Sequence, residues 1–383
     1  MISQRAAEVT PFLVMEVLEE AQRLERQGAH IVHMEVGEPD FDTPGCVVEG
    51  ALKALREGRT HYTHSMGLHE LRLAICAEYE KRYGAKVSPE QIVVTQGTSP
   101  ALFLVFGAIL EPGDEVILSN PYYACYPNYI RFAGGVPVYV DIGEEEGYQL
   151  RPEAIARRIT PRTKAILVNS PANPTGVVLD AERLADIANL GPLVISDEIY
   201  HGLVYEGREH SILEYTCNAV ALNGFSKQYA MTGWRLGYII APAAMARVLQ
   251  KIHQNFFISA NSFVQYGGIA ALREAECRAQ VEAMRQTYAD RRRYMLERLT
   301  GMGLSIPHPP TGAFYMLVNF RRYCSDSLAF AFELLREAKV AVAPGIDFGS
   351  NAEGYLRFSY ATSRENIAEG MDRLERYLAG KGR

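Results

Sequence analysis

The 383-residue chain lacks the features of a membrane or secreted protein. Its longest uncharged apolar run, residues 99–110, is shorter than the roughly 20 residues that a membrane-spanning helix needs. Glu16, Glu19 and Glu20 follow the apolar residues 11–15 at once, so the N-terminal residues do not have the pattern of a signal peptide. We therefore expect a cytoplasmic protein with no membrane partner.

Cysteine is sparse and shows no paired spacing. The six cysteines include no CxxC pair; they are Cys46, Cys76, Cys125, Cys217, Cys277 and Cys324. At this chain length and cysteine density a disulfide framework is not expected. We predict six reduced thiols, in keeping with a cytoplasmic location.

The chain also lacks an excess of positive charge and a metal-binding pattern. Its 45 acidic residues outnumber 39 lysines and arginines, which gives a net charge of −6. Proteins that bind nucleic acid through its phosphates need a basic face, so we expect no nucleic-acid partner. His61, His64 and His69 lack the spacing of metal ligands, and we expect no metal. Arginines 291–293 predict a solvated helix face.

Short apolar runs separated by helical patterns are abundant instead. Seven runs are almost continuously hydrophobic, as strands buried on both faces are; they are 91–95, 115–119, 136–140, 164–168, 193–196, 219–222 and 236–240. Residues 101–110, 152–159 and 181–189 have helical patterns. The alternation predicts a doubly wound α/β fold, with a mostly parallel seven-stranded sheet flanked by helices.

The pattern differs at both ends of the chain. A helix is predicted at 12–28 and a strand at 31–36, and long charged helices with short strands at 314–318 and 355–359 follow residue 280. A chain of this length favours two domains. We predict a large domain plus a smaller α+β domain built from both termini, with the boundaries 1–45 (N-terminal segment of the small domain), 46–280 (large domain) and 281–383 (small C-terminal domain).

Three charged side chains follow predicted strands. Lys227 ends a strand in Asn223-Gly224-Phe225-Ser226, Arg235 lies eight positions later, and Asp197 follows the run 193–196. Ligands bind outside the carboxyl ends of strands in such sheets, so one shared site is expected. A desolvated amine attacks a carbonyl, an arginine fork suits a phosphate, and an aspartate stabilises a protonated ring nitrogen. A pyridoxal 5′-phosphate (PLP) site requires these three groups.

Each of these signals has a plainer interpretation when taken alone. Lys227 would be a surface lysine, Arg235 a structural residue and Asp197 a helix cap. Residues 96–103 follow a strand and open a helix, so their amides favour an anion, yet they match neither GxGxxG nor a P-loop. Their combination, rather than any one residue, predicts a PLP-dependent enzyme.

Five motifs in chain order resemble those of the class I/II aminotransferases, which are fold type I PLP-dependent enzymes related to aspartate aminotransferase. They are Gly37-Glu38-Pro39-Asp40-Phe41, Asn173-Pro174-Thr175-Gly176, Ser196-Asp197-Glu198-Ile199-Tyr200, Ser226-Lys227 with Gly233-Trp234-Arg235-Leu236-Gly237, and Tyr355-Leu356-Arg357-Phe358-Ser359. The resemblance extends from about residue 10 to about residue 375 and is specific because all the motifs occur together.

The resemblance implies roles for the matching residues around the cofactor. Lys227 would form a Schiff base with PLP and carry the proton of the substrate α-carbon. Asp197 would pair with the ring nitrogen, and Tyr200, the third catalytic residue, would hydrogen-bond the 3′-oxygen together with Asn173. Tyr123 would stack on the ring. The phosphate side would be bound by Gly97, Thr98, Ser99, Ser226 and Arg235.

For the substrate, the resemblance implies that Arg357 clamps the α-carboxylate with help from Asn173 and the backbone at Gly37. Tyr62 would reach the phosphate in the partner subunit, which implies a homodimer with shared active sites. Ser99 stands where some aspartate-using relatives have a lysine, and no second cation is placed for a distal carboxylate. Apolar residues near Phe12 and in the stretch 258–261 favour a neutral or aromatic donor.

Gly224 is a further departure, because many relatives have Ser or Thr there. The resemblance still implies a transaminase that moves an amino group between an L-amino acid and a 2-oxo acid by a ping-pong mechanism, with 2-oxoglutarate and glutamate as one pair. Two alternatives stay open. A carbon–sulfur β-lyase or a ring-forming synthase would use the same residues, and a ligand-sensing regulator would need a DNA-binding domain, for which residues 1–40 leave no room.

Overall fold

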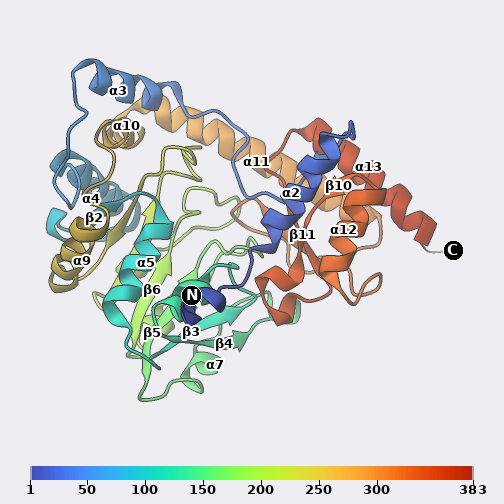
Figure 1. Cartoon of the computed structure of the whole chain (residues 1–383), viewed down its shortest axis with the longest axis horizontal. Coiled ribbons are helices and arrows are strands. Elements are labelled where there is room, and N and C mark those ends of the chain that lie inside the picture. Colours follow the sequence, from blue (N-terminus) through green and yellow to red (C-terminus); the bar gives the residue numbers. More distant parts are fainter. Residues whose placement is uncertain (1, 382–383) are drawn as a thin grey trace.

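The computed structural model describes residues 2–381. A seven-stranded sheet forms the centre of its larger part, in the order β2-β8-β7-β6-β5-β3-β4 (Figure 1). Its strands are β2 (Ile92–Thr95), β3 (Glu115–Asn120), β4 (Val136–Asp141), β5 (Thr163–Asn169), β6 (Leu193–Asp197), β7 (Ala219–Gly224) and β8 (Gly237–Ile240). Strands β3 to β7 pair in parallel, whereas β8 runs antiparallel to both β2 and β7. The predicted mostly parallel α/β sheet is confirmed.

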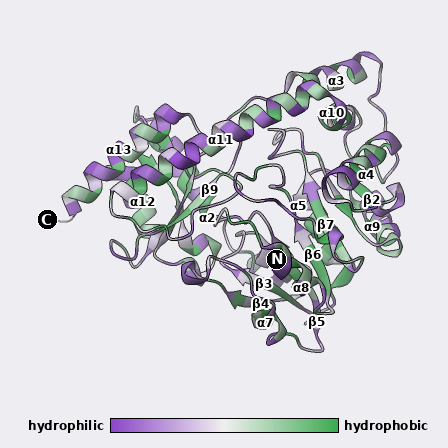
Figure 2. Ribbon diagram, turned by 180° about the vertical axis from the view of Figure 1, so that it is seen from behind, coloured by the Kyte–Doolittle hydropathy of each residue, from purple (hydrophilic) through white to green (hydrophobic). Residues whose placement is uncertain are grey.

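Helices cover both faces of this sheet because alternate strand residues point to opposite sides. In β2, Val94 belongs to one apolar cluster and Val93 to another. Figure 2 shows these strands in the colours of hydrophobic residues. The helices of this part are α3 (Gly45–Arg56), α4 (His69–Tyr83), α5 (Thr98–Ile109), α6 (Tyr126–Phe132), α7 (Pro152–Ala156), α8 (Ala181–Ala188), α9 (Ala243–Phe256) and α10 (Ser262–Arg273).

A smaller part of the molecule is built from both ends of the chain. Strand β1 (Val32–His33) pairs in parallel with β10 (Val340–Ala341), and β11 (Ala343–Pro344), β12 (Tyr355–Ser359) and β9 (Tyr315–Asn319) form an antiparallel sheet. Its helices are α2 (Leu13–Glu25), α12 (Ser327–Glu337) and α13 (Arg364–Lys381). Short helices occur along the whole described chain; they are α1 (Gln4–Ala7), η1 (Pro89–Gln91), η2 (Glu144–Glu146), η3 (Ile212–Glu214), η4 (Gly345–Phe348) and η5 (Ser350–Ala352). The boundaries 1–45, 46–280 and 281–383 stay a prediction.

Helix α11 (Ala275–Gly301) extends from α3 and α10 to α13 and so connects the two parts (Figure 1). The prediction of a solvated face at residues 291–293 is wrong for two of the three arginines. Arg291 and Arg292 are only 9% and 6% exposed, and each forms an ion pair with a carboxylate distant in sequence. Other segments pack on α11 from more than one side, which its charged sequence does not reveal. Arg293 is exposed as expected.

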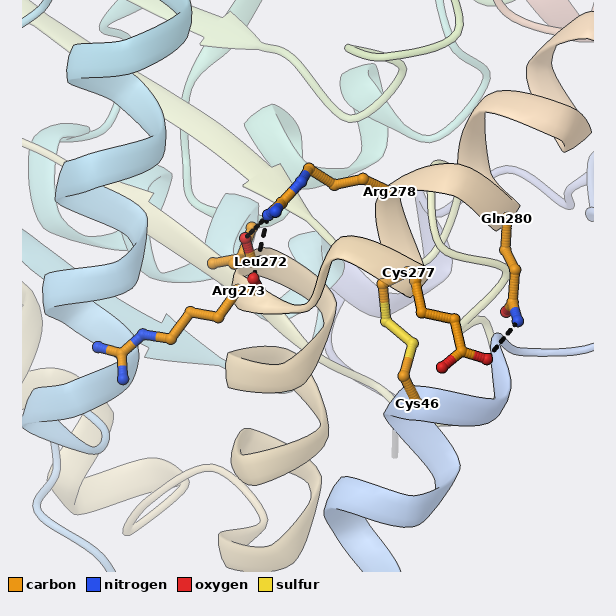
Figure 3. Close-up of a disulfide and its surroundings, with 7 residues drawn as sticks. Cys46, Leu272, Arg273, Cys277, Arg278 and Gln280 are labelled. Atoms are coloured by element: carbon orange, nitrogen blue, oxygen red, sulfur yellow. Dashed lines mark hydrogen bonds between the residues drawn. A yellow bond between two sulfur atoms is a disulfide. The ribbon is translucent and has the colours of Figure 1, made fainter.

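The prediction of six reduced thiols is also wrong for one pair. Cys46 in α3 and Cys277 in α11 form a disulfide, with their Cα atoms 6.0 Å apart (Figure 3). The two residues are separated by 231 positions, so no local sequence pattern predicts the bond. The free cysteines are Cys76, Cys125, Cys217 and Cys324.

Two features are absent from residues 2–381. No helix there is long and apolar enough to cross a membrane. No group of three or more His, Cys, Asp or Glu side chains in that range is arranged to hold a metal ion.

Candidate active site

A cavity of about 400 Å³ lies beyond the carboxyl ends of β5, β6 and β7, where the two parts of the molecule meet. Most residues predicted for the site line it: Gly37, Thr98, Ser99, Tyr123, Asn173, Asp197, Tyr200, Ser226, Lys227, Arg235 and Arg357. Two predicted residues do not line it. Gly97 lies behind Arg235, and Tyr62 is 86% exposed outside the cavity.

Lys227 follows β7 and directs its amine into the cavity. Its Nζ donates a hydrogen bond to the Gly37 carbonyl at 2.7 Å. Burial lowers the pKa of Lys227 to about 8; Glu38 opposes this shift, and the positive charge of Arg357 adds to it. A usable fraction of the amine is therefore neutral near pH 7 to 8, as a nucleophile or general base requires.

Asp197 ends β6 and is 4% exposed. Its Oδ2 accepts a hydrogen bond from Tyr126 Oη at 2.7 Å, and its Oδ1 accepts one from the Ile199 N–H at 3.2 Å. Burial raises the pKa of Asp197 to about 6, against these two hydrogen bonds and the charge of Lys227. A buried carboxylate in this position favours a cationic partner, such as a protonated ring nitrogen.

An anion site forms where α5 begins. Gly97 is the N-cap and has no side chain to accept from the first-turn amides, which leaves them available to an anion at the positive end of the helix. A Cβ at Gly97, whose φ is 95°, would lie 2.7 Å from Arg235 Nη2, so glycine permits the guanidinium to approach. Thr98 and Ser226 also line the cavity. The set suits a phosphate group.

Arg357 in β12 is 2% exposed and lies between two aromatic rings. Its guanidinium carbon is 4.3 Å from the centroid of Tyr315 and 4.7 Å from that of Phe348. Nη1 donates to Asn173 Oδ1 at 2.9 Å and Nη2 donates to the Glu35 carbonyl. Its Nε is buried without a partner among the described residues. A substrate carboxylate would satisfy this donor group.

Two tyrosines at the site, Tyr126 and Tyr315, were not predicted from the sequence, whereas Asn169 was expected there because it follows a predicted strand. Tyr126 bonds Asp197 as described, Asn169 Nδ2 donates to the Asp197 carbonyl at 2.9 Å, and Tyr315 Oη lies 2.7 Å from Tyr200 Oη. Neither tyrosine has a local motif, because each reaches the site only through the packing of separate elements.

The remaining wall of the cavity is mostly apolar, with Glu38 and Thr232 as its polar members. Its apolar side chains include Phe12, Val14, Met15 and Leu18 at the start of α2, together with Leu102. Phe12 packs edge-on against Tyr123, with ring centroids 6.2 Å apart. The stretch 258–261, which was also expected at the substrate, does not line the cavity of the single chain described here.

These residues fit PLP. An amine of lowered pKa, a buried carboxylate, a helix N-terminus with an arginine, and an aromatic face at Tyr123 are arranged around one cavity, while the unpartnered Nε of Arg357 is available for a substrate carboxylate. The fold and the site together define a PLP-dependent enzyme of fold type I.

The comparison with known proteins identifies the family. The chain belongs to the aminotransferases of class I and II, whose family model matches residues 29–374. It is 42% identical to the (5-formylfuran-3-yl)methyl phosphate transaminase of Methanocaldococcus jannaschii, over 99% of this chain and 100% of that protein. It is also 42% identical to the aspartate/prephenate aminotransferase of Thermus thermophilus, over 98% of each chain.

A solved structure agrees with this assignment. A double mutant of Thermus thermophilus aspartate aminotransferase superimposes with a TM-score of 0.94 at 42% identity, covering 98% of this chain and 99% of that one. The chain is therefore a PLP-dependent aminotransferase acting on an amino acid and a 2-oxo acid, which favours transfer over the elimination reaction that the sequence left open. The names of the relatives cover different substrates, so family membership does not identify the amino acid.

Proposed function

We propose that this aminotransferase takes a neutral or aromatic L-amino acid as its donor. One observation carries the proposal: the part of the cavity left for a substrate side chain is lined mainly by apolar residues. Lys227, Asp197, Arg235 and Arg357 are accounted for by the cofactor and the α-carboxylate. The remaining ionisable side chain among the described lining residues, apart from tyrosines, is Glu38, which is acidic. A distal carboxylate would find no cation there, whereas an apolar side chain would be desolvated favourably.

Each residue around the cofactor then has a proposed role. Bound PLP supplies an electron-withdrawing ring that weakens the Cα–H bond of the amino acid. Asp197, supported by Tyr126, would hold the ring nitrogen, and Tyr200 with Asn173 would bond the 3′-oxygen. The phosphate would lie among Gly97, Thr98, Ser99, Ser226 and Arg235.

Lys227 would hold the cofactor and act as the general base. Its pKa of about 8 lies near a neutral operating pH, which is optimal for a group that must both accept and return a proton. Its hydrogen bond to the Gly37 carbonyl orients the amine toward the substrate side of the cavity. Arg357 would fix the α-carboxylate, so that Cα is presented to Lys227 in one orientation.

We also propose a cytoplasmic homodimer with shared active sites. Tyr62 and Phe256 are 86% and 70% exposed, which is unusual for large aromatic side chains. The segments that carry them are adjacent, since His253 Nδ1 lies 2.8 Å from the Ser65 carbonyl oxygen and Ser262 Oγ donates to the Arg59 carbonyl at 2.6 Å. Tyr62 would reach the phosphate bound by the partner. We propose 2-oxoglutarate as one acceptor in a ping-pong cycle, and its distal carboxylate would then contact solvent or the partner subunit.

The donor class is tested by comparing phenylalanine with aspartate. The wild-type enzyme should show a kcat/KM at least about tenfold higher for phenylalanine, a ratio that apolar contacts can supply. Met15→Arg adds a cation to the apolar wall and should reduce this preference. Leu73→Arg is the matched control, because Leu73 is also a helical residue of similar exposure, 42% against 43%, outside the cavity. Equal or better use of aspartate by the wild type would contradict the proposal.

A further inference from the structure

The segment that follows β1 and enters the first turn of α3 joins the active site to the disulfide, and we call residues 37–46 the 37–46 strap. At its first residue, the Gly37 carbonyl accepts the hydrogen bond of Lys227 Nζ at 2.7 Å. At its last residue, Cys46 is bonded to Cys277 near the start of α11. A displacement of the strap would therefore move a carbonyl group that orients the amine of Lys227.

The middle of the strap lies along α11. Arg291 Nη1 donates to Asp40 Oδ1 at 2.7 Å, and the guanidinium carbon is 5.1 Å from the ring centroid of Phe41. The Phe41 ring also packs edge-on against Tyr288, with centroids 5.2 Å apart. These noncovalent contacts and the bond to Cys277 fasten the strap to the same helix.

The other side of the strap contacts the loop that carries Arg235. Thr43 Oγ1 donates to the Ala230 carbonyl at 2.6 Å and accepts from Trp234 Nε1 at 2.9 Å. Because Trp234 directly precedes Arg235, the position of the strap is linked to the phosphate corner as well as to the amine.

The two cysteine residues differ in their exposure to solvent. Cys277 is fully buried, whereas Cys46 is half-buried and lines an open hollow together with Glu49 and Lys53. Figure 3 shows the bond bridging α3 and the first turn of α11. An attacking thiolate needs access to one sulfur of a disulfide, and the hollow offers access at Cys46.

We propose that the Cys46–Cys277 disulfide is a thiol–disulfide exchange site that fastens the 37–46 strap and thereby tunes substrate binding. Its reaction partner is a dithiol, either a small molecule or a redox protein. One thiolate of the dithiol attacks Cys46 Sγ and forms a mixed disulfide, and Cys277 leaves as a thiolate and takes up a proton. The second thiol of the partner then displaces Cys46, so that the partner is oxidised and both cysteines are reduced. The site does not depend on which amino acid the enzyme uses.

In the disulfide form, the strap is held at both ends and along its length. In the dithiol form the strap keeps its noncovalent contacts, including those at Glu38, Asp40, Phe41 and Thr43, but loses the covalent bond at Cys46, so Gly37 and the loop before Arg235 gain freedom. Looser positioning of groups that contact the substrate and cofactor raises KM, because a bound substrate must then also order them.

The experiment uses the holoenzyme in buffers of graded dithiothreitol redox ratio, followed by removal of the reagent. Alkylation and mass spectrometry should count four free cysteines in the oxidised form and six in the reduced form. Reduction should lower the Tm by about 5 °C or more. It should raise the KM for the donor roughly threefold to tenfold, with kcat changed less.

Two variants separate the site from other thiols. Cys46→Ser should behave like the reduced enzyme and should not respond to the redox buffer. Cys217→Ser, at an exposed free cysteine, should keep the full response of the wild type. Three outcomes would each overturn the proposal: six free cysteines in an oxidising buffer, a disulfide that dithiothreitol does not reduce in the folded enzyme, or an equal KM in both forms. If Cys46→Ser does not fold, reduction of the folded wild-type enzyme still tests the proposal.

Discussion

At the scale of single residues, burial sets the chemistry of the site. Lys227 and Asp197 have pKa values moved toward each other, to about 8 and about 6, because desolvation penalises the charged form of each. The sequence predicts a desolvated amine at Lys227, because an apolar strand precedes it, but it gives no sign of the raised pKa of Asp197. The identities of both residues were predicted because each follows a strand, whereas Tyr126, which bonds Asp197, was not, because its position depends on how α6 packs.

The raised pKa of Asp197 gives a prediction for the cofactor-free protein. Between the usual value of 3.8 and about 6, the folded protein binds more protons than the unfolded chain, so its free energy of unfolding falls as pH rises through this range. Asp197→Asn removes this cost, which amounts to about 2 to 3 kcal/mol above pH 6. Denaturant unfolding at pH 4.5, 5.5 and 7.0 should show the variant gaining stability over the wild type as pH rises.

Asp186→Asn is the matched control for this prediction, because Asp186 is exposed on α8 and its substitution should change little at any of these pH values. The account of Asp197 would be refuted by a variant that is less stable than the wild type at pH 7.0. A stability difference that does not vary between pH 4.5 and 7.0 would refute it as well.

At the scale of secondary-structure elements, helix α2 depends on a distant cap. Its N-cap residue, Phe12, has no polar side chain, and the N–H groups of Leu13 and Val14 donate instead to the two carboxylate oxygens of Asp347, at 3.0 and 3.1 Å. Asp347 belongs to η4, which also supplies the Phe348 ring beside Arg357. The start of α2 is thereby fixed next to Arg357, where we propose that the substrate carboxylate binds.

Asp347→Ala should cost about 1 kcal/mol of stability, the usual loss for a cap. Since Phe12 and Val14 line the cavity, it should also raise the KM for the amino acid several-fold. Asp326→Ala provides the comparison: Asp326 caps α12 locally through the Ala329 N–H and lies outside the cavity. The two variants should lose similar stability in thermal unfolding, and only Asp347→Ala should change KM. A KM change in both, or in neither, would contradict the positioning role of Asp347.

The elements differed in how well the sequence predicted them. The seven strands of the large sheet were predicted because their apolar runs are long enough to be recognised. The two-residue strands β10 and β11 carry no such pattern and form through pairing with distant segments. The disulfide between α3 and α11 has the same origin, because only the tertiary fold brings Cys46 near Cys277. The burial of Arg291 likewise follows from the 37–46 strap packing on α11.

At the scale of the whole molecule, the site belongs to both parts of the fold. The large sheet provides Asp197 and the elements around Lys227, whereas α2 and β12 provide the apolar wall and Arg357. The motifs predicted a site formed by both parts of the chain, because they place charged residues after strands of the large sheet and in the C-terminal region. They did not predict the shape of the wall, which depends on how the two parts face each other.

The proposed homodimer leads to a prediction at the same scale. Tyr62→Phe removes only a hydroxyl group and should weaken cofactor binding about tenfold, as the loss of one charge-assisted hydrogen bond would, while the dimer persists. Phe256→Ala removes an exposed aromatic side chain and should weaken the dimer itself. Sedimentation velocity over a range of concentrations, with cofactor release measured in parallel, distinguishes the two effects. A wild-type monomer at all concentrations, or full cofactor affinity in Tyr62→Phe, would contradict the shared site.

The most direct test of the proposed donor class and of transamination is the absorption spectrum of the holoenzyme, titrated with single amino acids in the absence of an acceptor. Phenylalanine should convert the cofactor to its pyridoxamine form at lower concentration than aspartate, and 2-oxoglutarate should restore the original spectrum. Lys227→Ala should show neither change. An unchanged spectrum during release of ammonia and a keto acid would instead show elimination, and would contradict amino-group transfer by this enzyme.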